Sequence, residues 1–247
     1  MSYILEVCAD SVQSAVAAQE GGAGRVELCS ALVIGGLSPS AAMFRQVEEN
    51  TDLKIRVLLR PRFGDFCYDE YEFQTLAEEV QQFRELGADG VVIGILKPDG
   101  TINMEQMAEL VNAAKGIGIT MHRAFDVCSN PYEALEQCVS LGIDTILTSG
   151  QRSCAWEGRE LLSELVRRAD GRIDILAGAG IGPEVIRELA DYTGVRSFHM
   201  SGKKVLDSRM EFRRSGVPMG IPGFSEFEIW QTDADQVRRA VEILKER

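Results

Sequence analysis

The sequence lacks long hydrophobic runs and an excess of basic residues. No apolar stretch approaches the length of a membrane span, so we expect no membrane-spanning helix. The first residues show no basic segment followed by an apolar one, so no signal peptide is predicted. The formal net charge of −12 repels phosphate over long range and argues against nucleic acid or acidic membranes as partners. A small basic pocket for one phosphate is still compatible with this charge.

Paired cysteines and histidines are also scarce. None of the 6 cysteines forms a Cys-x-x-Cys pair, which argues against a zinc ribbon or a thioredoxin-like site. Unpaired cysteines without an export signal favour the reducing cytoplasm. The only 2 histidines are His122 and His199. Because histidine titrates near neutral pH, both are candidates for acid–base chemistry.

Short apolar runs alternate with amphipathic stretches along the whole chain. The runs are rich in Val, Ile and Leu, as strands buried on both faces should be. They predict eight strands, over residues 4–10, 25–31, 54–62, 90–96, 118–126, 145–150, 174–180 and 197–202. Proline at helix starts and glycine at helix ends mark seven helices between them, over residues 11–22, 39–49, 71–86, 104–115, 131–141, 158–169 and 183–192.

Eight strands that alternate with helices indicate a parallel sheet. No glycine-rich dinucleotide fingerprint follows the first strand, so a (β/α)8 TIM barrel is favoured over an open doubly wound sheet. We expect one domain over residues 1–247. Residues 203–247 exceed what a closing helix needs, and they predict an irregular arm over 208–231 and a last helix over 233–245. The arm should pack on its own barrel, cover the site or cross a dimer interface, burying Phe224, Phe227 or Trp230.

Side-chain alternation predicts which strand residues face the inside of the barrel. Glu6, Glu27, Arg60 and His122 lie on the polar faces of their strands, opposite apolar faces that suit packing under the helices. Buried charges must be paired, and two carboxylates can pair with an arginine on a neighbouring strand. These residues form either an ion-pair layer that fills the barrel or part of a functional site at the C-terminal ends of the strands.

The functional interpretation gains support from position. The late parts of the strands meet at one rim of such a barrel. The candidate catalytic residues for acid–base chemistry there are Glu27, Arg60, His122, Asp126 and His199, with Arg62, Arg123 and Ser149 nearby.

Cys8 and Cys29 occupy equivalent places in the first two predicted strands. Neighbouring strands lie about 4.8 Å apart, so two inward thiols can meet one ion. Paired soft thiolates suit Cu(I), which makes both residues candidate metal ligands. The alternative is that each packs as a small hydrophobic residue. The other four cysteines have no matched partner.

The loops after the seventh and eighth strands are the usual phosphate site of a TIM barrel. They read Gly-Ala-Gly-Ile-Gly-Pro over 178–183 and Ser-Gly-Lys-Lys over 201–204. Gly180, Ser201, Gly202 and Lys203 are therefore candidates for holding an anion, since glycines let backbone N–H groups face it. The alternative is that these glycines only turn the chain.

Several ordered motifs together resemble the CutC copper-homeostasis family. They are Glu-Val-Cys-Ala-Asp over 6–10, Arg-Val-Glu-Leu-Cys-Ser over 25–30, Gly-Gly-Leu-Ser-Pro-Ser over 35–40, Arg-Pro-Arg-Phe-Gly-Asp-Phe over 60–66, His-Arg-Ala-Phe-Asp over 122–126, Leu-Thr-Ser-Gly over 147–150 and Met-Glu-Phe-Arg over 210–213. The resemblance implies a cytoplasmic TIM barrel, a homodimer and a role in copper tolerance or Cu(I) binding, with thiol ligands at Cys8 and Cys29. The chain departs from the family at Phe63, where Gly is usual, and at Leu176-Ala177, where Met-Pro is common.

Copper does not explain the other polar residues at the rim. A carrier of Cu(I) needs two or three soft ligands and has no evident need for Arg60, His122, Asp126 or an anion loop. Two functions therefore stay open: a Cu(I)-binding homeostasis protein, and an enzyme that performs acid–base chemistry on a small anionic or phosphorylated substrate.

Overall fold

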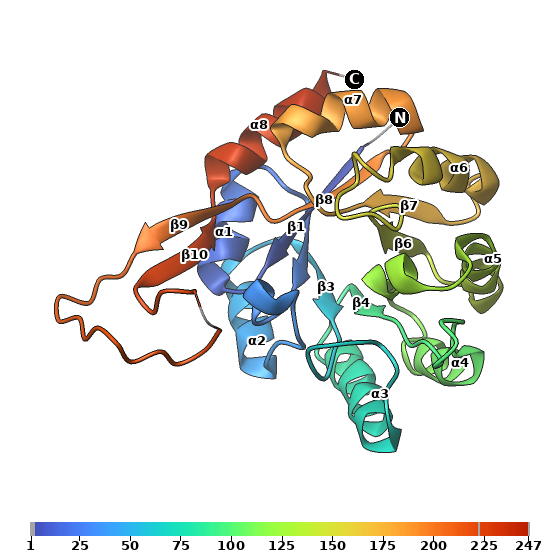
Figure 1. Cartoon of the computed structure of the whole chain (residues 1–247), viewed down its shortest axis with the longest axis horizontal. Coiled ribbons are helices and arrows are strands. Elements are labelled where there is room, and N and C mark those ends of the chain that lie inside the picture. The colour runs from blue at the N-terminus through green and yellow to red at the C-terminus, as the bar shows by residue number, and fades with distance from the viewer. Residues whose placement is uncertain (1–2, 222, 247) are drawn as a thin grey trace.

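Eight parallel strands close into a barrel, with β1 paired to both β2 and β8. The structure is a computed structural model, and it describes residues 3–221 and 223–246 (Figure 1). The result confirms the predicted (β/α)8 TIM barrel. The barrel strands are β1 (Ile4–Ala9), β2 (Arg25–Leu28), β3 (Lys54–Leu58), β4 (Gly90–Ile93), β5 (Gly118–Met121), β6 (Thr145–Thr148), β7 (Asp174–Ala177) and β8 (Ser197–Met200).

Helices surround the barrel, and most begin at a residue that caps the free backbone N–H groups. The side chain of Asp69 accepts a hydrogen bond from the backbone N–H of Glu72, and the side chain of Glu72 accepts one from the backbone N–H of Asp69. Together they form a complete capping box. Pro131 and Pro183 occupy first helical positions, as predicted. The helices are α1 (Val12–Glu20), α2 (Ala41–Asn50), α3 (Glu70–Glu85), α4 (Met104–Ala113), α5 (Pro131–Leu141), α6 (Arg159–Ala169), α7 (Pro183–Thr193) and α8 (Ala234–Lys245). No helix among the described residues is long and apolar enough to cross a membrane.

The alternation of side chains produces two distinct apolar clusters. The large one contains outward strand residues such as Val7 and Val26, packed under the helices. The small one joins Cys8 and Cys29 to Leu58 and Val92. The predicted inward residues Glu6, Glu27, Arg60 and His122 are all buried.

Several strands end earlier than the sequence predicted. The fifth was expected to continue to residue 126, but β5 ends at Met121, and the 3-10 helix η2 (Arg123–Val127) follows. The cause is local, because His122 accepts a hydrogen bond from the backbone of Ala124 and starts the turn. β2 ends at Leu28 and β3 at Leu58, and the 3-10 helix η1 (Leu32–Ile34) follows β2.

The C-terminal extension contains an arm that sequence reasoning described only in part. Its base is an antiparallel ribbon, β9 (Lys203–Asp207) paired with β10 (Glu228–Thr232). The prediction of an irregular arm over 208–231 is therefore wrong for its last residues, which form β10. The arm projects beside α1, away from the barrel strands (Figure 1). Phe224 is 44% exposed, and Trp230 is half-buried with its ring centroid 5.8 Å from that of Phe224. The arm therefore does not cover the mouth of its own barrel.

Candidate functional site

A cavity of about 480 Å³ opens at the C-terminal ends of the barrel strands. This is the end at which TIM-barrel enzymes carry their active sites. Its walls combine thiol, carboxylate, imidazole and cationic groups with an apolar lining. The wall residues are Cys8, Glu27, Leu32, Gly35, Leu58, Arg60, Phe66, His122, Arg123, Leu147, Ala179, Gly180, Ile181, His199, Met200, Ser201 and Lys203.

Two thiols meet at the floor of this cavity. Sγ of Cys8 lies 3.8 Å from Sγ of Cys29, and Cys29 also contacts the carbonyl oxygen of Ala9 at 3.6 Å. Hydrogen bonding with Cys29 and burial raise the pKa of the Cys8 thiol well above its ordinary value. Both cysteines are buried, and Cys8 is the one that reaches the cavity wall. A soft ion at Cys8 is therefore within reach of both sulfurs.

A buried carboxylate fixes the imidazole of His199 beside these thiols. Oε1 of Glu6 lies 2.8 Å from Nδ1 of His199, and Oε2 lies 2.6 Å from Nε of Arg25. Burial alone would raise the pKa of Glu6, but its contacts with His199 and Arg25 hold this pKa below its usual value. Because Nδ1 is held by Glu6, Nε2 is the nitrogen that remains available to a ligand.

Glu27 completes a group that can hold a metal ion. One ligand atom each from Cys8, Glu27 and His199 all lie within 4.8 Å of one another. Burial raises the pKa of Glu27 to about 7, and the negative charge of Glu6 adds to the rise against the opposing effect of His199. Burial lowers the pKa of His199, but Glu27, Cys8 and Glu6 together hold it well above the ordinary value. Sequence reasoning placed Glu27 and His199 among acid–base residues and did not group them with Cys8.

His122 lies on another wall, beside Phe66 and Arg60. The ring centroids of Phe66 and His122 are 4.8 Å apart, and Cζ of Arg60 lies 4.9 Å from the Phe66 centroid. Burial and the positive charge of Arg60 lower the pKa of His122 to about 3. Nδ1 of His122 accepts from the backbone N–H of Ala124, so the neutral ring carries its proton on Nε2. His122 is therefore a neutral hydrogen-bond donor at physiological pH.

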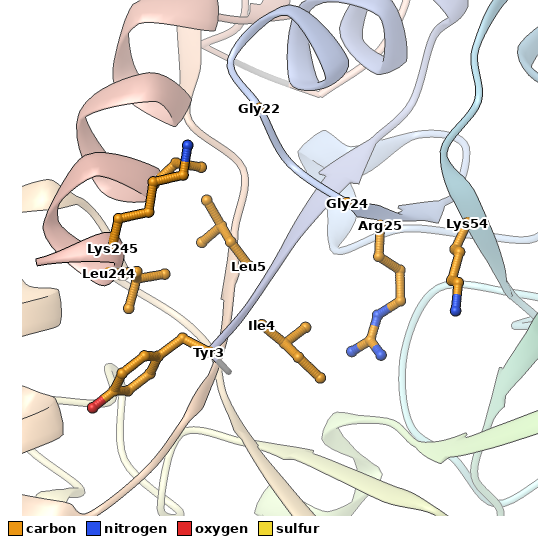
Figure 2. A pocket seen from close by; sticks show the side chains of 10 residues that line it. Tyr3, Ile4, Leu5, Gly22, Gly24, Arg25, Lys54, Leu244 and Lys245 are labelled. Carbon is orange, nitrogen blue, oxygen red and sulfur yellow. The ribbon is translucent and has the colours of Figure 1, made fainter. Parts of the chain in front are cut away.

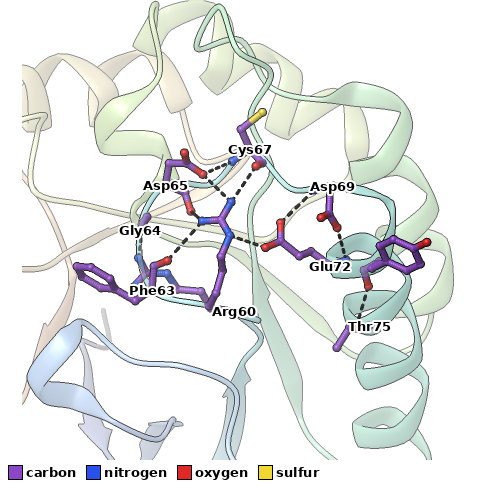
Figure 3. A network of polar contacts seen from close by, with 10 residues as sticks. Arg60, Phe63, Gly64, Asp65, Cys67, Asp69, Glu72 and Thr75 are labelled. Carbon is purple, nitrogen blue, oxygen red and sulfur yellow. Dashed lines mark hydrogen bonds and ion pairs between the residues drawn. The ribbon is translucent and has the colours of Figure 1, made fainter. Parts of the chain in front are cut away.

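Arg60 and Arg62 have different surroundings although they are two residues apart. Arg62 is held by the carboxylates of Asp65 and Glu72 and by the carbonyl oxygen of Cys67, in the network that Figure 3 shows. Arg60 donates to the backbone carbonyl oxygens of Gly36 at 3.3 Å and Gly64 at 2.6 Å. Arg60 forms no ion pair with the inward carboxylates among the described residues, contrary to expectation: Glu6 pairs with Arg25 and His199, and Glu27 contacts Cys8.

Asp126 lies outside the cavity wall. Its carboxylate accepts hydrogen bonds from Thr148, Ser149 and the backbone of Gln151, and it pairs with Arg123 at 2.7 Å. Its contacts with Thr148, Ser149 and Gln151 therefore hold the end of β6 and the loop after it against η2. Arg123 does line the cavity, because the turn at His122 breaks the alternation that would have placed it on the opposite face.

Only some of the residues predicted to hold an anion line the cavity. Gly180, Ser201 and Lys203 line the cavity, whereas Gly202 does not. Gly202 has φ of +51°, and a Cβ there would lie 3.0 Å from Met200, so its role is to turn the chain. Nζ of Lys203 lies 3.8 Å from the ring centroid of Trp230, which ties the base of the arm to the cavity.

A second cavity, of about 540 Å³, lies at the other end of the barrel, where the strands begin (Figure 2). Ile4 and Leu244 contribute apolar surface, and Arg25, Lys54 and Lys245 contribute positive charge. Lys54 and Lys245 are exposed, and Arg25 is engaged by Glu6. The thiols and histidines all lie toward the opposite opening, which makes that opening the candidate functional site.

Sequence reasoning singled out neither Arg25, which pairs with Glu6, nor Phe66, which lies against His122. Arg25 shares its strand face with Glu27, so alternation alone marks it as inward. Phe66 follows the end of β3 by eight residues, and no local pattern shows that its loop folds back onto His122.

The model of the CutC family matches residues 3–204. The chain belongs to the CutC family. A CutC family protein from Bacteroides fragilis (strain YCH46) is 45% identical over 98% of this chain and 97% of its own length. A copper homeostasis protein cutC homolog from Mus musculus is 40% identical over 99% of this chain and 90% of its own length. The resemblance in the sequence motifs is confirmed.

Solved structures agree on the fold. A crystal structure of a CutC protein from Streptococcus agalactiae matches with a TM-score of 0.76 and 30% identity, covering 81% of this chain and 98% of that one. A thiamine phosphate pyrophosphorylase from Pyrococcus furiosus matches with a TM-score of 0.60 and 18% identity over 99% of this chain and 96% of its own. The second likeness concerns the barrel alone. The family model ends at Lys204, where the arm begins.

Proposed function

We propose that this CutC family protein takes part in copper homeostasis by binding Cu(I) at the floor of the barrel mouth. The observation that carries the proposal is the distance of 3.8 Å between Sγ of Cys8 and Sγ of Cys29. Metal–thiolate bonds are about 2.3 Å long, so one ion can contact two sulfurs at this separation. Thiolates are the ligands that Cu(I) prefers, which favours copper(I) over harder cations.

The surrounding donors fit the same ion. His199 is directed by Glu6 so that Nε2 is free to act as a third ligand, an arrangement typical of metal-binding histidines. Glu27 contacts Cys8 at 3.7 Å and can accept the thiol proton when the ion binds. The site requires reduced cysteines, so we propose that the protein acts in the cytoplasm, where thiols stay reduced.

The experiment is a competition titration with a chromophoric Cu(I) chelator under reducing conditions. We expect Cys8→Ser and Cys29→Ser each to weaken Cu(I) binding by more than about tenfold. Cys67→Ser is the matched control, because Cys67 is a free cysteine in the loop after β3 and does not line the cavity. Unchanged affinity in the Cys8→Ser, Cys29→Ser double variant contradicts the proposal.

The arm supports a further proposal, that the protein forms a homodimer. An isolated two-stranded ribbon is marginally stable in water and usually needs another surface to pack against. The arm exposes a set of large apolar side chains: Val205, Leu206, Met210, Phe212, Val217, Met219, Ile221, Phe224 and Ile229. An exposed apolar surface of this kind is typical of an interface, and we propose that a second copy of the chain covers it.

A further inference from the structure

The cavity holds more polar machinery than a Cu(I) site uses. Cys8, Glu27 and His199 come from β1, β2 and β8, whereas Arg60 and Phe66 follow β3 and His122 follows β5. These two groups of residues line the same cavity. The second group has no task in binding a soft metal ion, so its contacts need a separate explanation.

The decisive feature is an unused hydrogen-bond donor on His122. The residue is only 4% exposed, and its Nε2 has no hydrogen-bond partner among the described residues. A buried donor without an acceptor destabilises the folded state, so proteins rarely keep one unless something else binds there.

The ring of His122 forms part of the cavity wall. The Nδ1 edge is covered, since it accepts from the backbone of Ala124 at 3.1 Å and lies against Gly94. A Cβ at Gly94 would lie 2.6 Å from both Nδ1 and Cε1 of His122. Any larger residue at position 94 would therefore clash with the imidazole ring in this position. Nε2 is therefore the ring nitrogen that stays unpaired among the described residues, in a side chain that lines the cavity.

Positive charge converges on the same wall. Arg60 is 8% exposed and forms no ion pair among the described residues, and its Nε has no hydrogen bond of good geometry there. Lys203 also lines the cavity, without a carboxylate partner in the part of the chain that the structure describes. Arg123 also lines the cavity, with its charge balanced by Asp126. Glu27 is the one carboxylate in the wall, and it contacts Cys8 on the thiol side.

We propose that the barrel mouth binds a small organic oxyanion, with its acid group held between Arg60 and Nε2 of His122. A guanidinium and a neutral N–H are both donors, which matches the acceptor oxygens of a carboxylate or a phosphate. The apolar walls formed by Phe66, Leu147 and Ile181 suit the carbon skeleton of such a ligand. The volume of about 480 Å³ suits a small metabolite and excludes a polymer.

This anion site does not depend on copper. It adds an organic ligand to the proposed function, and it places that ligand beside the residues assigned to acid–base chemistry, Glu27, His122 and His199. The two proposals use different residues, so they can fail separately.

The test is calorimetric titration of the metal-free full chain at constant ionic strength. The probes are inorganic phosphate, malonate and glycerol 3-phosphate, with chloride as the reference anion. Arg60→Gln and His122→Phe should each weaken binding by about tenfold or more, because each removes a charged or otherwise unmatched donor. Arg45→Gln removes the same charge from the exposed face of α2 and should bind like the unmodified protein.

Two further variants keep the test decisive if a substitution harms folding. Arg60→Lys preserves the positive charge but loses the paired donors of the guanidinium, so it should bind the anion more tightly than Arg60→Gln. His122→Gln preserves a neutral N–H donor, so it should bind more tightly than His122→Phe. The Cys8→Ser, Cys29→Ser double variant should still bind the anion. Preference for phosphate or for malonate identifies the acid group. The proposal is overturned if no probe binds better than chloride, or if Arg60→Gln binds as tightly as Arg45→Gln.

Discussion

Nδ1 of His199 lies 2.8 Å from Oε1 of Glu6, inside the barrel and below the two thiols. The same carboxylate pairs with Arg25 at 2.6 Å, so one buried acid connects a possible metal ligand to a cation at the far end of the barrel. Outer partners of this kind fix the orientation of a metal-binding histidine. The ion-pair layer and the functional site, which the sequence presented as alternatives, are joined in one arrangement.

Glu6→Gln should destabilise the protein and weaken Cu(I) binding together. The change leaves Arg25 and His199 without their buried partner, and loss of one member of such a pair costs roughly 3 kcal/mol in the free energy of unfolding. Urea unfolding measures this loss. Glu184→Gln breaks an exposed pair with Arg239 and should change the free energy by less than about 0.5 kcal/mol. Equal losses in the free energy of unfolding for the two substitutions would contradict a larger contribution from the buried contact.

His122 should make the fold sensitive to acid. Its pKa in the folded protein is about 3, against an ordinary value of 6.5, so the unfolded chain takes up the proton first. The stability that depends on neutral His122 is complete above pH 6.5 and is lost as the pH falls from there towards 3, by about 1.4 kcal/mol per pH unit. Between pH 7 and pH 5 the free energy of unfolding should fall by about 2 kcal/mol more than in His122→Gln. Parallel curves for the two proteins would contradict a buried neutral imidazole.

Gly94→Ala should disturb the anion wall and leave the thiols in place. The added Cβ would meet the His122 ring at 2.6 Å, and the resulting shift should cost about 1–3 kcal/mol. Gly24→Ala is the matched control, because a Cβ there meets nothing within 4 Å. We expect weaker phosphate binding and unchanged Cu(I) affinity in Gly94→Ala. Loss of both ligands, or of neither, would contradict the division of the cavity into two parts.

The arm should determine the mass of the protein in solution. Leu206 and Ile229 are paired across the ribbon and both are exposed, so the double substitution Leu206→Glu, Ile229→Glu places charge on the proposed interface. Light scattering should show a dimer for the unmodified chain and a monomer for this variant. Tyr71→Glu alters an exposed side chain at the start of α3 and should leave the dimer intact. A monomer in every case would remove the proposed role of the arm.

The barrel could be predicted from the sequence because its signals are local and repeated. Apolar runs, proline at helix starts and glycine at helix ends recur in each unit, and alternation identified Glu6, Glu27 and Arg60 as inward. The proximity of Cys8 and Cys29 was predicted from their places in neighbouring strands and is confirmed, although the register pairs Cys8 with Glu27 and Cys29 follows the end of β2.

The rest depended on contacts between distant loops. Arg123 reaches the cavity only because the chain turns at His122, and Phe66 reaches His122 only because the loop after β3 folds inward. Asp126 was a reasonable candidate by its place in the sequence, yet Thr148 and Ser149 satisfy its carboxylate. Alternation shows which face a strand residue occupies, but it does not show which partner will satisfy it.

The central claim is that two thiols of this chain bind one Cu(I) ion, and X-ray absorption at the copper edge tests it most directly. The sample is the full chain loaded with one equivalent of Cu(I) under reducing conditions. We expect two sulfur neighbours at about 2.3 Å, with one sulfur neighbour lost in Cys29→Ser. A copper environment made only of nitrogen and oxygen, or one unchanged by the loss of Cys29, would contradict the claim.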